Sequence, residues 1–215
     1  MIIGFILSFI RKKNKKLLKT TYHELGHLYV ALLFDNFIPV TQLVIGKKGI
    51  KAKTGNNHLN GGVAYNIDMR NFNDINFVDQ FIGVSLAGMC SQNLFFINRE
   101  EFKIKIPLFV LQPDRYMNNE GGIADWELAK NNLTSNSIKL GIPSTQYRED
   151  IMEYIFSYLS RDEVWDSIDL FANILLRKRK MTLNRIEINS IINKINYNDF
   201  LNRNRINIIN SRYPL

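Results

Sequence analysis

The chain has 215 residues, of which 46% are hydrophobic and 12% aromatic, a composition typical of a folded globular protein and not of a disordered one. A single cysteine, Cys90, excludes an internal disulfide and a cysteine-rich structural zinc site. The net charge of +8 comes from two local runs, six positive charges in residues 11–19 and four in residues 177–180. Because the other positions together are slightly acidic, no basic face and no nucleic-acid partner is expected.

The N-terminal residues 1–10 are apolar, but a membrane-spanning helix needs about twice that length. A secretory signal carries its positive charge before the apolar run, whereas here the charge follows it. Two interpretations of residues 1–15 stay open: their apolar side chains dock on the domain, or they form a shallow membrane anchor followed by basic residues. We expect a cytoplasmic protein, with residues 1–19 as the candidate region for peripheral membrane contact.

The first predicted helix covers residues 16–34. Apolar side chains recur in it at spacings of three and four residues, which places on one face Leu18, Tyr22, Leu25, Tyr29 and Leu32. The polar pair Asp35-Asn36 and the following Pro39 end the helix.

This helix contains the motif His23-Glu24-Leu25-Gly26-His27. Residues four positions apart share one helix face, so His23 and His27 can direct two imidazoles at one metal ion. Glu24 can reach a metal-bound water as general base. Gly26 has no side chain, which would allow a neighbouring segment to approach closely. The motif therefore predicts a Zn²⁺ site with two histidine ligands and a catalytic glutamate.

A third ligand must come from elsewhere, because a catalytic zinc site uses three protein ligands and keeps one position for water. His58 lies in a polar loop, and Asp125 and Glu127 open a predicted helix over residues 124–133. A carboxylate in a first helical turn also stabilises the helix dipole. Spacing alone leaves these alternatives open.

The remaining segments predict a mainly α fold with a small β hairpin or sheet near the motif helix. Strands are expected at residues 40–45 and 63–68, separated by a glycine-rich loop over 47–62. Helices are expected at residues 74–96, 124–133, 147–160, 162–180 and 182–192, with an irregular segment at 97–120 and a turn at 141–143. Cys90 is expected to be a buried small hydrophobe. The expected organisation is an N-terminal segment (1–15), one domain (16–193) and a loosely attached tail (194–215).

Several segments resemble the peptidase domain of the FtsH family of membrane-anchored, ATP-dependent zinc proteases. Thr21-Tyr22-His23-Glu24-Leu25-Gly26-His27, followed by Ile38-Pro39-Val40, resembles the start of that domain. Further similar segments keep the family's order from about residue 16 to residue 193: 41–45 with 61–63, 86–88, 171–176 and 181–188. Residues 122–129 resemble the segment whose aspartate is the family's third zinc ligand, which corresponds to Asp125.

The resemblance implies a zinc metalloendopeptidase in which His23, His27 and Asp125 hold Zn²⁺ and Glu24 activates the zinc-bound water. No Gly-x-x-x-x-Gly-Lys-Ser/Thr phosphate loop occurs in the sequence, so the activity is expected to be independent of an ATPase module in this chain. The expected partners are a polypeptide substrate and either a separate ATPase or further copies of the chain. The alternative is a non-hydrolytic binding or scaffold protein, and a weaker one is regulation at a membrane surface.

Overall fold

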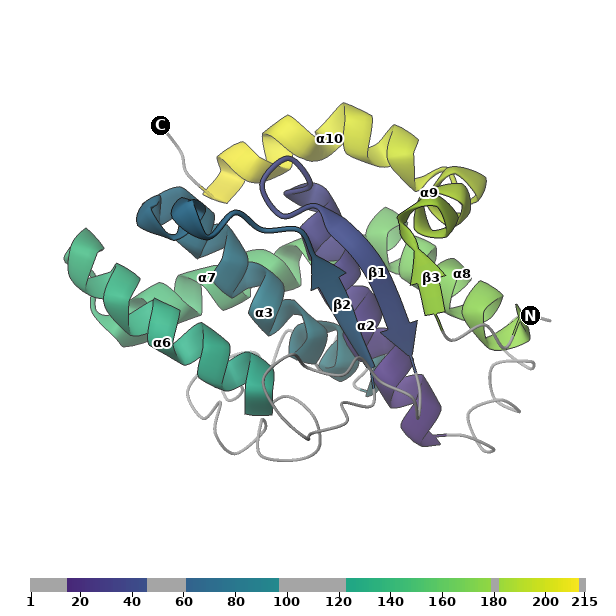
Figure 1. Cartoon of the computed structure of the whole chain (residues 1–215), viewed down its shortest axis with the longest axis horizontal. Helices are drawn as coiled ribbons and strands as arrows, with labels where there is room; N and C mark the ends of the chain where they lie inside the picture. Colours follow the sequence, from purple (N-terminus) through teal and green to yellow (C-terminus); the bar gives the residue numbers. More distant parts are fainter. Residues whose placement is uncertain (1–14, 46–60, 97–122, 179–181, 213–215) are drawn as a thin grey trace.

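The computed structural model describes residues 15–45, 61–96, 123–178 and 182–212. Within these ranges it is mainly helical with one small antiparallel sheet (Figure 1), which confirms the predicted fold class at that level. The elements, in chain order, are α2 (Lys15–Leu33), β1 (Val40–Ile45), β2 (Gly61–Tyr65), the 3-10 helix η1 (Met69–Asn73), α3 (Ile75–Phe96), α6 (Ile123–Leu140), α7 (Ser144–Leu159), α8 (Asp162–Lys178), β3 (Thr182–Asn184), α9 (Arg185–Lys194) and α10 (Tyr197–Arg212).

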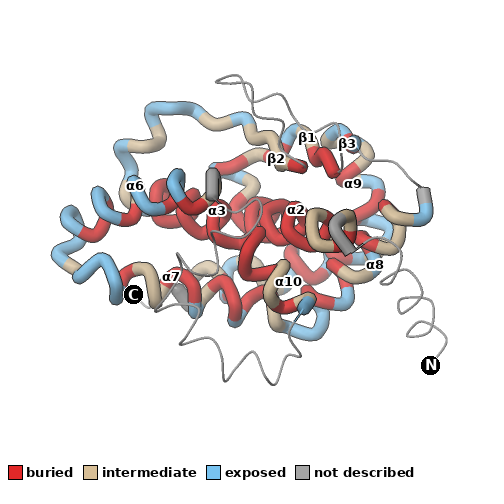
Figure 2. Tube along the Cα trace, turned by 90° about the horizontal axis from the view of Figure 1, so that it is seen from below, coloured by how far each residue is buried: buried red, intermediate tan, exposed pale blue. Residues whose placement is uncertain are grey.

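Helix α2 lies at the centre of the fold. Every residue from Thr21 to Phe34 is buried, and Figure 2 shows α2 as an almost continuously buried segment between other elements. Helix α3 packs against it in the opposite direction, since Tyr22 stacks on Phe95 with ring centroids 3.9 Å apart while His27 contacts Val84. A helix enclosed in this way places its polar side chains inside the protein, where each must be satisfied by a specific partner.

The sheet has three antiparallel strands in the order β2-β1-β3. Strand β1 has its predicted bounds, whereas β2 begins and ends two to three residues earlier than predicted. Strand β3 replaces the predicted start of the last helix: Leu183 pairs with Leu43 and is buried. The helix begins instead at Arg185, because Asn184 caps it in a capping box with Glu187.

Helix α6 is longer than predicted and ends at Leu140 rather than at residue 133. Its polar residue Asn136 is buried and donates to the carbonyl of Ile75 at 3.1 Å and to the hydroxyl of Tyr147 at 2.9 Å. These tertiary contacts keep helical a stretch whose composition suggests a loop. The predicted turn after the helix is confirmed by Gly141, which has a positive φ of 67°.

The prediction of a loosely attached C-terminal tail is wrong. Residues 197–212 form α10, and four of its side chains join the hydrophobic core: Tyr197, Phe200, Leu201 and Ile208. Arg205 also donates to the carbonyl of Leu32 at 3.0 Å, in the last turn of α2. The asparagine and arginine residues between the apolar positions lower the average hydropathy of this segment and conceal the periodicity of its buried face.

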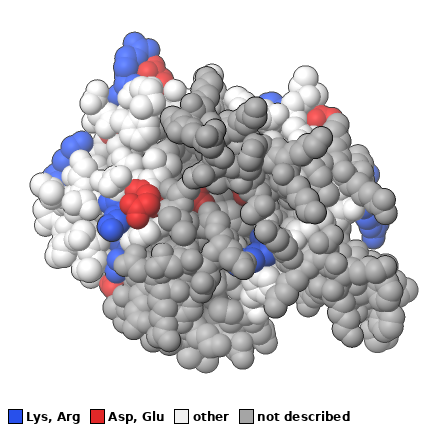
Figure 3. Space-filling model, turned by 60° about the horizontal axis from the view of Figure 1, so that its bottom comes forward, with Lys and Arg blue, Asp and Glu red and all other residues white. Residues whose placement is uncertain are grey.

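The described chain contains no helix that is both long and apolar enough to cross a membrane. On the face shown in Figure 3, the described Lys and Arg side chains lie apart from one another, in places beside an acidic side chain, and form no continuous basic patch. The expectations for residues 1–14 and for the segment 97–120 lie outside the described residues.

Candidate metal centre

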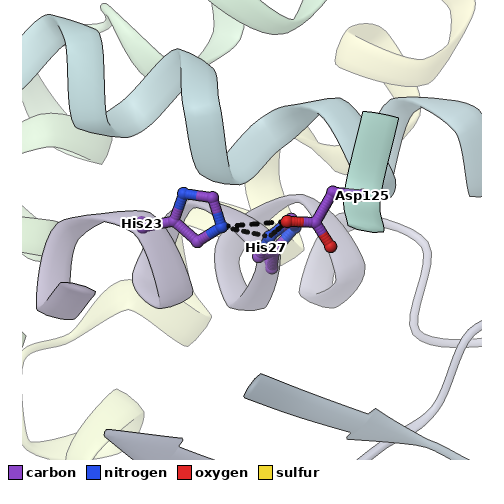
Figure 4. Close-up of side chains that lie close together, drawn as sticks. All are labelled: His23, His27 and Asp125. Carbon is purple, nitrogen blue, oxygen red and sulfur yellow. Dashed lines mark hydrogen bonds and ion pairs between the residues drawn. The ribbon is translucent and has the colours of Figure 1, made fainter. Parts of the chain in front are cut away.

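Three side chains with metal-binding atoms meet beside α2. Nε2 of His23 lies 3.0 Å from Oδ2 of Asp125, and Nε2 of His27 lies 3.4 Å from the same oxygen. The two histidine Nε2 atoms are 3.1 Å apart. Figure 4 shows that His23 and His27 project from successive turns of one helix and that Asp125 reaches them from the start of α6. The structure therefore brings together the two motif histidines and the acid that the family resemblance indicates.

The spacing of these donor atoms fits a zinc ion. Donors bonded at about 2.0–2.1 Å to a tetrahedral zinc lie about 3.3–3.4 Å from one another. The three observed separations, 3.0, 3.1 and 3.4 Å, are close to those edges. Two imidazole nitrogens and one carboxylate oxygen form a mixed donor set that suits zinc and leaves a fourth position open.

Helix α3 orients the second histidine. Nδ1 of His27 donates to the carbonyl oxygen of Val84 at 2.7 Å, and this bond is buried. In the neutral imidazole the proton then resides on Nδ1, so the lone pair of Nε2 points at the other two donors. A backbone carbonyl in this role is a common outer partner of a metal-binding histidine, because it fixes both the tautomer and the ring orientation.

Two glycines allow the helices to approach closely enough for this contact. A Cβ atom on Gly26 would lie 2.4 Å from the carbonyl oxygen of Ala87 and 2.5 Å from Cβ of Ser91. A Cβ atom on Gly88 would lie 2.3 Å from Nε2 of His27. The predicted close approach at Gly26 is thus confirmed. Sequence reasoning did not identify Gly88 as a positioning residue, although a lone glycine inside a helical pattern is a signal of such packing.

Glu24 lies beside the cluster and outside the set of three donors. The residue is 6% exposed, and its side chain reaches the first residue of β2, where a Cβ atom on Gly61 would lie 2.6 Å from Oε1 of Glu24. Burial raises the pKa of Glu24; His23 and His27 oppose the shift, and Asp125 adds to it. A buried carboxylate with a raised pKa can accept and release a proton closer to neutral pH than an exposed one.

The metal-free cluster forms a partly buried ion pair. Burial disfavours the charged imidazolium of His27, but Asp125 and Glu24 outweigh this effect and raise the pKa of His27 to about 9. Burial likewise disfavours the charged carboxylate of Asp125, but His27 and His23 hold its pKa well below the ordinary range. A strongly negative site of this kind favours a cation, either a proton or a metal ion.

The other candidates for the third ligand do not join this cluster. Glu127 is exposed on α6, two positions beyond Asp125, and residues two apart on a helix point to different sides. His58 lies outside the described residues. Cys90 is buried as predicted, and burial raises the pKa of its thiol, so it remains a neutral core residue and not a thiolate ligand.

Comparison with family models, with curated proteins and with solved structures finds no match to this chain.

Proposed function

We propose that this chain is a zinc-dependent peptidase in which His23, His27 and Asp125 hold the metal and Glu24 is the general base. The observation that carries the proposal is the convergence of three suitable donors at tetrahedral spacing next to a buried glutamate. The order of segments that resemble the FtsH-type peptidase domain supports the same reaction.

Zinc, when bound, supplies a Lewis acid that polarises a scissile carbonyl and lowers the pKa of water. Glu24 accepts a proton from the attacking water as the new C–O bond forms at the carbonyl carbon. The same carboxyl group then gives that proton to the amide nitrogen as the C–N bond breaks. Burial of Glu24 suits both halves of this exchange, since its raised pKa makes the protonated form accessible.

The proposed substrate is an unfolded polypeptide. The 215 residues contain no nucleotide-binding phosphate loop, so mechanical unfolding of a folded substrate would come from a separate ATPase. A non-hydrolytic scaffold with the same metal site is the competing function, and hydrolysis assays separate the two.

The decisive experiment compares the wild type with Glu24→Gln, using zinc analysis of the purified protein and cleavage of a casein-like unfolded substrate. The wild type should hold one zinc per chain. Glu24→Gln should keep that zinc and lose about 10²- to 10⁴-fold in turnover, because the general base is removed while the ligands stay. Glu127→Gln makes the same chemical change at an exposed position and should leave both the zinc content and the turnover unchanged.

Three results would contradict the proposal. A wild-type protein that takes up no zinc would rule out the metal site. Zinc binding without cleavage of any unfolded substrate would favour the scaffold function. Cleavage by Glu24→Gln at the wild-type rate would show that Glu24 is not the base.

A further inference from the structure

Strand β2 presents one of its faces to the metal centre. Its antiparallel register pairs Gly61 with Ile45, Val63 with Leu43 and Tyr65 with Val40. Directly paired residues lie on the same face of a sheet, and these β1 partners are all buried, so the shared face is the one turned to the core. Gly61 on this face touches Glu24.

Tyr65 lies on that face because it is two residues beyond Val63 in a regular strand, and a β-bulge in β1 places Val40 opposite it. The register shifts between Val40 and Gln42, so that β1 contains one residue more than β2 at this point. Without the extra residue, Val40 and Leu43 would point to opposite faces, since successive side chains in a strand alternate. The bulge therefore turns Val40 of β1 to the core, opposite the end of β2 that carries Tyr65.

The ring of Tyr65 packs against the hydrophobic core, but the residue as a whole is only partly buried. The carboxylates of Glu24 and Asp125 are among the charges that act on its phenol. Burial first, and then these two carboxylates, raise the pKa of Tyr65 well above that of free tyrosine. A tyrosine hydroxyl is protonated at neutral pH and can donate a hydrogen bond.

We propose that Tyr65 is a further catalytic residue, whose hydroxyl donates a hydrogen bond to the oxyanion that develops on the scissile carbonyl. This inference rests on the proposed peptidase function. Tyr65 keeps its own proton throughout: the electron pair of the C=O bond moves to oxygen when water attacks, and the phenol stabilises that charge without transferring a proton. A hydrogen-bond donor that a strand holds in place needs little movement when the negative charge develops, which makes its stabilisation of that charge effective.

Substitution of Tyr65 by Phe tests the assignment, because it removes the hydroxyl and keeps the packing ring. Tyr154→Phe is the matched control, since its hydroxyl donates to the carbonyl of Ile208, on α10 and outside the site. Both variants should hold one zinc per chain. Tyr65→Phe should lose about 100- to 1000-fold in kcat, the range for one oxyanion donor, with KM within about twofold of wild type, and Tyr154→Phe should retain wild-type kcat.

A second measurement reports on Tyr65 independently of turnover. A phosphinic peptide, whose tetrahedral anionic group imitates the oxyanion, should bind zinc-loaded Tyr65→Phe more weakly than wild type by a factor similar to the loss in kcat. A product peptide should bind both equally. Equal phosphinate affinity for wild type and Tyr65→Phe would overturn the assignment, as would phosphinate binding to neither. A wild type that binds phosphinate through Tyr65 but hydrolyses nothing would overturn the proposed function alone.

Discussion

The two sides of the metal centre are built differently. On one side, α2 and α3 meet through Gly26 and Gly88 at distances that leave no room for a Cβ atom, and the histidines between them are buried. On the other side, Asp125 stands in the first turn of α6, its side chain is 29% exposed, and it comes from 102 residues further along the chain than His23.

The side chains on the two sides are therefore held in position by different kinds of packing. The histidine pair is held by helix geometry and by close packing, in which a change of one methyl group is felt directly. The aspartate depends on the docking of a whole helix, which Trp126, Ala129 and Leu133 attach to the core and Asn136 joins to α3 and α7. We expect substitutions on the first side to damage the fold together with the site, and substitutions on the second side to damage the site alone.

The largest effect is expected for Gly88→Ala. The new Cβ atom would lie 2.3 Å from Nε2 of His27, so the ring must leave its position or the helices must separate. The variant should lose zinc and about 1–3 kcal/mol of unfolding free energy, the usual cost of overpacking. Zinc analysis and chemical denaturation measure the two losses.

Gly83→Ala is the matched control for that substitution. It lies on the same helix, but its Cβ atom would be 3.5 Å from Cδ1 of Ile155, an ordinary contact. Removing a glycine from a helix interior should then leave zinc binding unchanged and stabilise the protein by up to about 1 kcal/mol. Equal behaviour of Gly88→Ala and Gly83→Ala would show that the packing around His27 is not tight.

A smaller and more selective effect is expected for Asp125→Ala. Loss of a direct ligand should weaken zinc binding by more than the roughly 10- to 100-fold typical of an outer partner, while the unfolding free energy of the metal-free protein changes little, because the side chain is partly exposed. Competition with a chelator measures the affinity. Glu127→Ala, at the exposed neighbouring acid, should keep the wild-type affinity; a loss there equal to that of Asp125→Ala would reassign the ligand.

The last effect concerns pH and involves His27 on one side of the centre and Asp125 on the other. In the metal-free protein the pKa of His27 is raised from 6.5 to about 9, so the stability it contributes is complete below pH 6.5 and is lost as the pH rises through 9. The unfolding free energy should fall across this window by up to about 3 kcal/mol. Asp125, whose pKa is lowered, contributes throughout the window and loses its effect only in acid.

Denaturation of the chelator-treated protein at several pH values checks this expectation. Asp125→Asn should flatten the dependence, because the neutral amide no longer favours the imidazolium. Saturating zinc should also flatten it, since the metal replaces the proton on His27. A metal-free stability that rises between pH 6.5 and 9 would contradict the ion pair.

The sequence by itself determined the features that follow from local periodicity. Two histidines four residues apart on a helix share one face, so the pairing of His23 and His27 could be predicted without knowledge of the fold. The bounds of β1 and the close approach at Gly26 follow from short patterns of the same kind. The segment over residues 197–212 shows where such patterns fail, because the apolar face of α10 is hidden among polar residues until the core that covers it is known.

Only the tertiary structure decided which distant residues complete the site. Spacing alone left Asp125 and Glu127 as equivalent candidates, and only the family resemblance indicated Asp125. The docking of α6 brings Asp125 and not Glu127 to the histidines, because the two side chains leave the helix in different directions. Gly88 and Tyr65 are placed in the same way, by a helix packed against His27 and by a strand whose first residue lies beside Glu24. Side-chain direction within one element follows from backbone geometry, whereas contact between elements depends on how the whole core packs.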